Sequence, residues 1–126
     1  MTERVLDPQV KALLDQTGPY AGSPMETRLP LLIIGAGLPP PCVQWVVQDP
    51  TMRTAFWLDL AWPELMIGIE YEGEPRTEPA RVQRDIARHT RLVDLGWQVY
   101  GYTKREVYGY RARIVADLTR ARARST

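Results

Sequence analysis

Two β-strands joined by a short turn are predicted by residues 57–74, which read WLDLAWPELMIGIEYEGE. Apolar and aromatic side chains make up most of both strands, and Pro63-Glu64 marks the turn between them. Asp59 lies near the middle of the first strand and Glu70 near the end of the second. A hairpin with this turn brings the two carboxylates level with each other, to within about two residues.

These two carboxylates define the candidate site. A carboxylate among apolar residues is costly to bury unless it is paired or binds a cation. Two carboxylates on adjacent strands also repel each other, and a divalent metal removes that repulsion. With no Cys or His nearby in the sequence, oxygen ligands predict Mg²⁺ or Mn²⁺ rather than zinc. The alternative is that Asp59 and Glu70 lie on a hydrated sheet face, or at strand ends, and pair with arginines.

The composition is that of one globular domain. The 126 residues are 44% hydrophobic and 25% charged, which argues against disorder and against two domains. The single Cys42 excludes an intramolecular disulfide and a cysteine-cluster zinc site. No apolar run approaches the roughly 20 residues that cross a membrane, and the first residues lack the apolar segment of a signal peptide. We therefore expect a cytoplasmic protein without a membrane partner.

The net charge of +1 conceals an uneven distribution. Residues 1–75 hold four Lys/Arg and ten Asp/Glu, whereas residues 76–126 hold twelve Lys/Arg and five Asp/Glu. An acidic half joined to a basic half suits an acidic metal site beside a phosphate-binding surface. The two halves can equally attract each other and solubilise helices, so the charge separation alone does not decide between these readings.

Helices precede the predicted strands. Residues 8–16 are predicted to form a short first helix, followed by a Gly/Pro break. The next helix begins with the sequence SPME, in which Ser23 and Glu26 can form a capping box, and it ends at Gly37. Capping alone therefore explains Glu26, and a catalytic role for it rests on other grounds.

The remaining segments complete the order α-α-β-β-β-α-β-α. Residues 43–48, 54–62 and 65–72 are predicted strands of an antiparallel meander. A helix over 78–95, a strand over 97–102 and a helical region over 103–120, broken near Gly109, follow. This order predicts an α/β (α+β) fold, a mixed sheet flanked by helices. We expect residues 1–22 to be an appendage or linker helix, 23–120 the domain, and 121–126 a frayed basic tail.

The helix over 78–95 carries two stripes of residues. The apolar stripe predicts the buried face, and we interpret His89 within it as a core histidine rather than a catalytic one. The basic stripe is either a solvated face or, beside an acidic centre, a DNA-binding surface. The apolar stripe is Val82, Ile86, His89 and Val93, and the basic stripe is Arg81, Arg84, Arg88 and Arg91.

Five segments together resemble a nuclease superfamily. They are SPMETR (23–28), LDLAWPE (58–64), IEYEGE (69–74), QRDIAR (83–88) and LGWQV (95–99). Their order is similar to that of the PD-(D/E)xK restriction-endonuclease-like nucleases. More narrowly, the chain resembles the short endonuclease domains related to very-short-patch mismatch-repair endonucleases, which often form the C-terminal part of longer actinobacterial proteins. The resemblance covers about residues 23–116.

The resemblance implies a four-stranded core sheet flanked by helices, and cleavage of DNA at a Mg²⁺ or Mn²⁺ ion. Asp59 and Glu70 would hold the metal, and the carbonyl oxygen of Tyr71 would complete the set. Glu26 would be the helical acid that often joins such sites.

The sequence also departs from the motif. Glu72 stands where the signature has a lysine, which orients the attacking water and offsets transition-state charge. A histidine in the next loop is missing, and Arg81-Val82 occupies the place of a Gln-Tyr pair. Gln83 and Arg84 are candidates to replace the lysine.

Three hypotheses follow. In the first, the protein is a Mg²⁺-dependent DNA endonuclease, in which Glu72 and Glu26 assist the metal or position water and the arginine stripe holds phosphates. In the second, it is a degenerate nuclease fold that binds DNA or a protein partner without cutting. In the third, it is an interaction domain cut from a longer chain. A homodimer and a fusion to an upstream domain both remain open.

Overall fold

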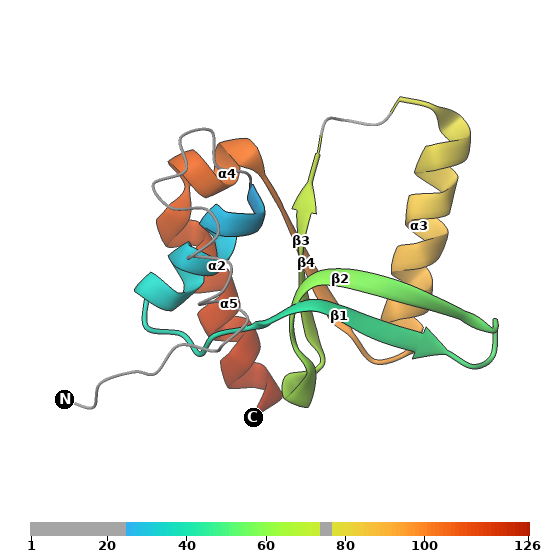
Figure 1. Ribbon diagram of the computed structural model, residues 1–126, viewed down its shortest axis with the longest axis horizontal. Coiled ribbons are helices and arrows are strands. Elements are labelled where there is room, and N and C mark those ends of the chain that lie inside the picture. The colour runs from blue at the N-terminus through green and yellow to red at the C-terminus, as the bar shows by residue number, and fades with distance from the viewer. Residues whose placement is uncertain (1–24, 74–76) are drawn as a thin grey trace.

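A computed structural model describes residues 25–73 and 77–126. A four-stranded sheet separates α3 on one face from α2, α4 and α5 on the other (Figure 1). This arrangement confirms the predicted mixed sheet flanked by helices. The helix predicted over 8–16 and the capping box at Ser23 lie outside the described residues. In chain order the elements are α2 (Met25–Gly35), β1 (Cys42–Asp49), β2 (Thr54–Trp62), the 3-10 turn η1 (Pro63–Leu65), β3 (Ile67–Glu72), α3 (Pro79–Asp94), β4 (Gln98–Thr103), α4 (Lys104–Gly109) and α5 (Arg111–Ser125).

The sheet has the order β1-β2-β3-β4. The first three strands form the predicted antiparallel meander, and β4 runs parallel to β3 after the crossover through α3. Leu60 pairs with Ile69 across β2 and β3. Extended by one step beyond the paired residues, this register brings Asp59 level with Glu70, and the charge of Glu70 does act on Asp59.

The larger core lies between the sheet and the three helices α2, α4 and α5. Trp62 anchors it: the ring is almost fully buried, and its Nε1–H donates to the carbonyl oxygen of Pro39 at 2.9 Å. The sheet and the helices contribute alternate apolar residues, so this core fixes the end of β2 and all of α5 together. Its fully buried members include Leu29, Ile33, Leu60, Ile67, Ile69, Ile114 and Leu118.

The helix ends follow the signals in the sequence. Gly37 and Gly96, with φ of +89° and +94°, follow α2 and α3 in the left-handed conformation that favours glycine. Thr103 begins α4 through a capping box: its Oγ1 accepts the Glu106 N–H at 3.2 Å, and the Glu106 carboxylate accepts the Thr103 N–H at 3.0 Å. These caps hold the connections that lead into and out of β4.

The end of α5 differs from the prediction of a frayed basic tail over 121–126. The helix continues to Ser125, and Ala121 has no exposed surface. The guanidinium of Arg122 lies 4.6 Å from the centre of the Trp62 ring, a cation–π contact that holds the last turns against the core. The tail prediction is wrong because alternate basic residues still leave one apolar position per turn for packing.

The orientation of α3 also differs from the prediction. Ile86 and Val93 are 61% and 52% exposed, and His89 is exposed rather than part of a core. Only Leu92 of this helix is fully buried, among the residues of a smaller core with Leu58, Ala61 and Trp97. The predicted apolar stripe is therefore wrong, because arginines on the other stripe face carboxylates of the sheet.

Candidate functional site

Strands β1 and β2 change face at Gln44 and Asp59. The pairs on either side are regular, but the register skips these two opposed residues, and Gln44 has a φ of +59°. Leu60 packs in the core of α2, α4 and α5, whereas Leu58, two positions earlier, packs in the core of α3. Residues two apart share one face of a regular strand, so the hairpin turns over at this point. The turn-over sets Asp59 beside β3 at the boundary between the two cores.

Gly68 makes room for this turn-over. A Cβ on Gly68 would lie 2.8 Å from Leu58 Cδ1, closer than two carbon atoms can approach. The Leu58 side chain therefore covers the bare backbone of β3, two residues before Glu70. A glycine at this position allows the strand bend that places Asp59.

The carboxylate of Asp59 is subject to the charges of other acidic residues. Its Oδ2 accepts the backbone N–H of Tyr71 at 2.8 Å. Burial raises the pKa of Asp59, and the charges of Glu70 and Glu26 raise it further, while the Tyr71 N–H and Arg88 act in the opposite direction. Acids from α2 and β3 thus act on the half-buried carboxyl group of Asp59 in β2. The same environment raises the pKa of the Tyr71 phenol, through burial and then the charges of Asp59 and Glu26.

Glu70 is held by an arginine of α3. Arg88 Nη1 and Nη2 donate to Glu70 Oε1 and Oε2 at 2.8 and 2.7 Å, and Nη2 also donates to the carbonyl oxygen of Trp57 at 2.6 Å. The bidentate bond and the Glu70 charge raise the pKa of Arg88. Part of the predicted alternative is therefore correct, since one of the two carboxylates does meet an arginine.

A polar pocket of about 340 Å³ opens beside this pair, between α3 and the ends of β3 and β4. Glu72 lies two residues after Glu70. Its carboxylate lies so close to the backbone of Gly101 that a Cβ at position 101 would clash with it. His89, predicted as a core residue, is one of the pocket residues instead. The pocket is lined by Glu70, Tyr71, Glu72, Asp85, Arg88, His89, Val99 and Gly101.

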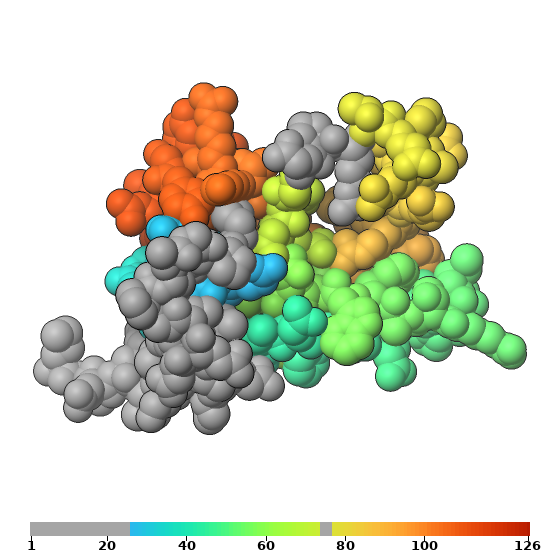
Figure 2. All heavy atoms as spheres, turned by 45° about the horizontal axis from the view of Figure 1, so that its top comes forward, coloured from blue at the N-terminus to red at the C-terminus, as the bar shows by residue number. Residues whose placement is uncertain are grey.

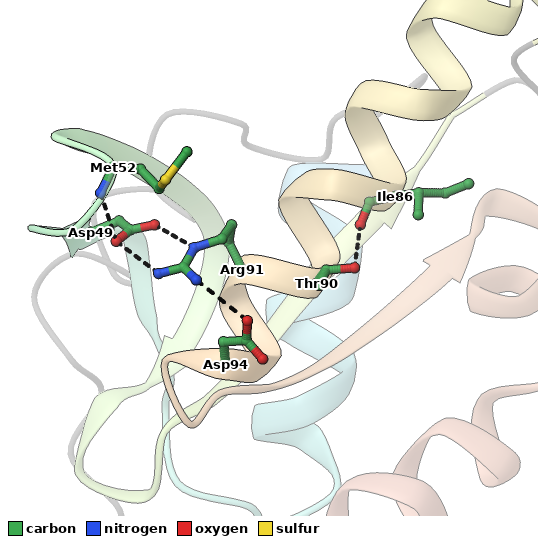
Figure 3. Close-up of polar contacts among 6 residues, drawn as sticks. All are labelled: Asp49, Met52, Ile86, Thr90, Arg91 and Asp94. Carbon is green, nitrogen blue, oxygen red and sulfur yellow. Dashed lines mark hydrogen bonds and ion pairs between the residues drawn. The ribbon is translucent and has the colours of Figure 1, made fainter.

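The basic stripe of α3 does not form one surface. Arg91 donates from Nε and Nη2 to the carboxylate of the buried Asp49 at 2.7 and 3.0 Å, and from Nη1 to Asp94 at 3.3 Å (Figure 3). Arg88 and Arg91 therefore attach the helix to the sheet, whereas Arg81 and Arg84 are exposed. The four arginines therefore do not share one exposed face, and phosphate binding by this stripe stays a prediction.

The sequence does not predict that Arg88 contacts the acidic centre. Its candidates to replace the lysine are Gln83 and Arg84. Both of those residues are exposed. The available signal was spacing: Arg88 lies four residues before Leu92, the buried residue of α3, and so shares its face of the helix.

The donor set fits Mg²⁺ or Mn²⁺ in its chemistry. Mg²⁺ is often bound by one or two carboxylates together with water and substrate phosphate, and Asp59 and Glu70 supply such a pair. Glu26, exposed in the first turn of α2, acts on Asp59 through its charge. Within residues 25–73 and 77–126, no three or more His, Cys, Asp or Glu side chains are arranged to hold a metal, so Glu26 and Glu72 do not join Asp59 and Glu70 in such a group.

No helix in the described part of the chain is both long and apolar enough to cross a membrane.

Comparison with known proteins finds two mycobacterial relatives. The chain is 35% identical over 108 residues to the uncharacterized protein Rv2248 of Mycobacterium tuberculosis strain H37Rv, and equally to the uncharacterized protein MT2308 of strain CDC 1551. The aligned region covers 81% of this chain and 39% of each relative, so the chain spans about two fifths of their length. No family model and no solved structure matches the chain.

Proposed function

We propose that this protein is a Mg²⁺- or Mn²⁺-dependent DNA endonuclease whose metal is held by Asp59 and Glu70. The observation that carries the proposal is the half-buried Asp59, set opposite Glu70 and within reach of the charge of Glu26. Burial and the charges of Glu70 and Glu26 raise the pKa of Asp59, which disfavours its ionised form, and a bound divalent cation would relieve that cost. Such costly groups are typical of functional sites.

DNA as the substrate is supported by the distribution of positive charge. Helices α3 and α4 begin where the parallel strands β3 and β4 end, and Figure 2 shows them on either side of the end of β3. Both helices carry exposed basic residues near their first turns: Arg81 and Arg84 on α3, and Lys104 and Arg105 on α4. A duplex lying across this edge would meet basic side chains on both sides of the acidic centre.

Each residue of the site has a definite part in the proposed reaction. Asp59 and Glu70 would hold the Mg²⁺ or Mn²⁺ ion, which would supply a lowered pKa for water and offset charge on the scissile phosphate. The Tyr71 N–H orients Asp59, and Arg88 orients Glu70. The water oxygen forms a bond to phosphorus as the phosphorus–oxygen ester bond breaks; the water proton passes to solvent, and the departing alkoxide takes a proton from solvent.

Cleavage of supercoiled plasmid by the purified chain tests the function. We expect nicking that requires Mg²⁺ or Mn²⁺ and that falls by at least about 100-fold in Asp59→Asn, the scale on which loss of a charge-stabilising group acts. Arg120→Gln, on the surface of α5, is the control for an altered surface charge and should cleave normally. Equal cleavage by Asp59→Asn and the wild type would show that the centre is assigned to the wrong residues.

The second candidate is a nuclease fold that binds DNA without cutting it. Both oxygens of Glu70 are engaged by Arg88, and Glu72 stands where the motif has a lysine; both features favour this candidate. It predicts salt-dependent DNA binding without any metal-dependent product. Binding that persists unchanged in an Arg81→Gln/Arg84→Gln double variant would exclude the exposed side of α3 as the binding surface.

A further inference from the structure

We propose that Arg88 is a catalytic residue, which binds a non-bridging oxygen of the scissile phosphate while it holds Glu70. This inference rests on the proposed function and names the cation that the motif position Glu72 does not supply. Arg88 differs from the other arginines of α3, because it alone among them lines the pocket beside the acidic centre in the described structure.

The guanidinium of Arg88 is fixed before any substrate arrives. Three hydrogen bonds, two to Glu70 and one to the Trp57 carbonyl oxygen, tie α3 to β3 and β2 at one point. The Phe56 ring lies 6.0 Å from the guanidinium carbon and supports the same position. A charged group that is already oriented stabilises developing charge without the cost of reorganisation.

Arg88 also has donors left for a ligand. A guanidinium carries five N–H groups in a planar fork, and three of the five are used by contacts with described residues. The side chain is 30% exposed, and the pocket of about 340 Å³ lies beside it. The remaining N–H groups can therefore meet a phosphate oxygen without breaking the bond to Glu70.

The pocket beside Arg88 also holds acidic side chains. Glu70, Glu72 and Asp85 line the pocket, and a phosphodiester entering it brings one more negative charge. Arg88 is the only Lys or Arg among the described residues that line it. While the bidentate bond to Glu70 is kept, a remaining N–H of the guanidinium can donate a single hydrogen bond to a phosphate oxygen.

The test uses the whole chain and three variants: Arg88→Gln, Arg88→Lys and the control Arg120→Gln. Plasmid cleavage is measured in Mg²⁺ and in Mn²⁺. Separately, the Arg88 Nε–H signal, assigned by its loss in Arg88→Lys, is followed by NMR in EDTA as a short DNA duplex is added. Circular dichroism and thermal melting establish that each variant is folded.

We expect Arg88→Gln to lose at least about 100-fold in cleavage, Arg88→Lys to recover part of it, and the Nε–H signal to shift on addition of the duplex. Cleavage by Arg88→Gln within about twofold of the wild type would overturn the role of Arg88 and leave the endonuclease intact. If the wild type does not cleave, the proposed function fails. The NMR signal then decides alone: a shift supports Arg88 as a phosphate contact, and no shift refutes it.

Discussion

Arg91 of α3 and Asp49 at the end of β1 form a bidentate ion pair in which the carboxylate side chain has no exposed surface. Asp49 also accepts the backbone N–H of Met52 at 3.3 Å, within the turn between β1 and β2. Together with the pair between Arg88 and Glu70, this contact attaches α3 to the sheet at two places. The position of the helix over the acidic centre therefore depends on charged pairs as much as on apolar packing.

The Asp49 pair predicts a loss of stability in acid. The hydrogen bond from Arg91 lowers the pKa of Asp49 below its ordinary value of 3.8. A lowered pKa contributes stability that is complete well above pH 3.8 and is lost as the pH falls through the folded-state value. Thermal unfolding of the wild type and Asp49→Asn should thus differ most near neutral pH, with the wild type more stable, and the difference should shrink below pH 3.8. A difference that is constant down to about pH 2 would contradict the pairing.

Replacement of Gly68 tests the strand bend. Gly68→Ala places a methyl group against Leu58 and should destabilise the protein by about 1–3 kcal/mol, the usual cost of overpacking. Chemical denaturation measures this change in the free energy of unfolding. Gly35→Ala is the matched control, because nothing lies within 4 Å of the added Cβ, and it should not destabilise the protein. Equal stability of the two variants would mean that Leu58 does not pack over β3.

Neutralising Asp59 should stabilise the metal-free protein. Asn keeps the acceptor for the Tyr71 N–H while removing a charge that burial, Glu70 and Glu26 all disfavour. In EDTA at neutral pH we expect the melting temperature of Asp59→Asn to rise by a few degrees, because 1 kcal/mol corresponds to roughly 2–8 °C across small and medium-sized domains. The exposed Glu64→Gln controls for net charge. A lower melting temperature for Asp59→Asn would show that its charge is satisfied within the fold.

The sequence predicts the parts of the fold that depend on local chemistry. The turn at Pro63 and Gly37 after α2 act over a few residues, and each lies where predicted. The capping box at Thr103 and Gly96 after α3 are equally local. The opposition of Asp59 and Glu70 follows from the turn alone, since one turn sets the register of both strands.

Local sequence signals do not predict which face of α3 is turned toward the sheet. The spacing of its apolar residues predicts a buried face that includes Ile86 and Val93, but both are exposed. The face toward the sheet instead carries Arg88 and Arg91, because these arginines form ion pairs with Glu70 and Asp49. Helical periodicity does not include the charge of a sheet that forms elsewhere in the chain. The positive φ of Gln44 was equally hidden, because nothing in its sequence marks a strand that changes face.

Titration calorimetry of Mn²⁺ into the metal-free chain tests the central claim most directly. The account predicts that the wild type binds Mn²⁺, that Asp59→Asn and Glu70→Gln each lose this binding, and that Glu64→Gln retains it. Binding by Asp59→Asn with unchanged affinity, or no binding by the wild type, would contradict a metal centre at these two carboxylates.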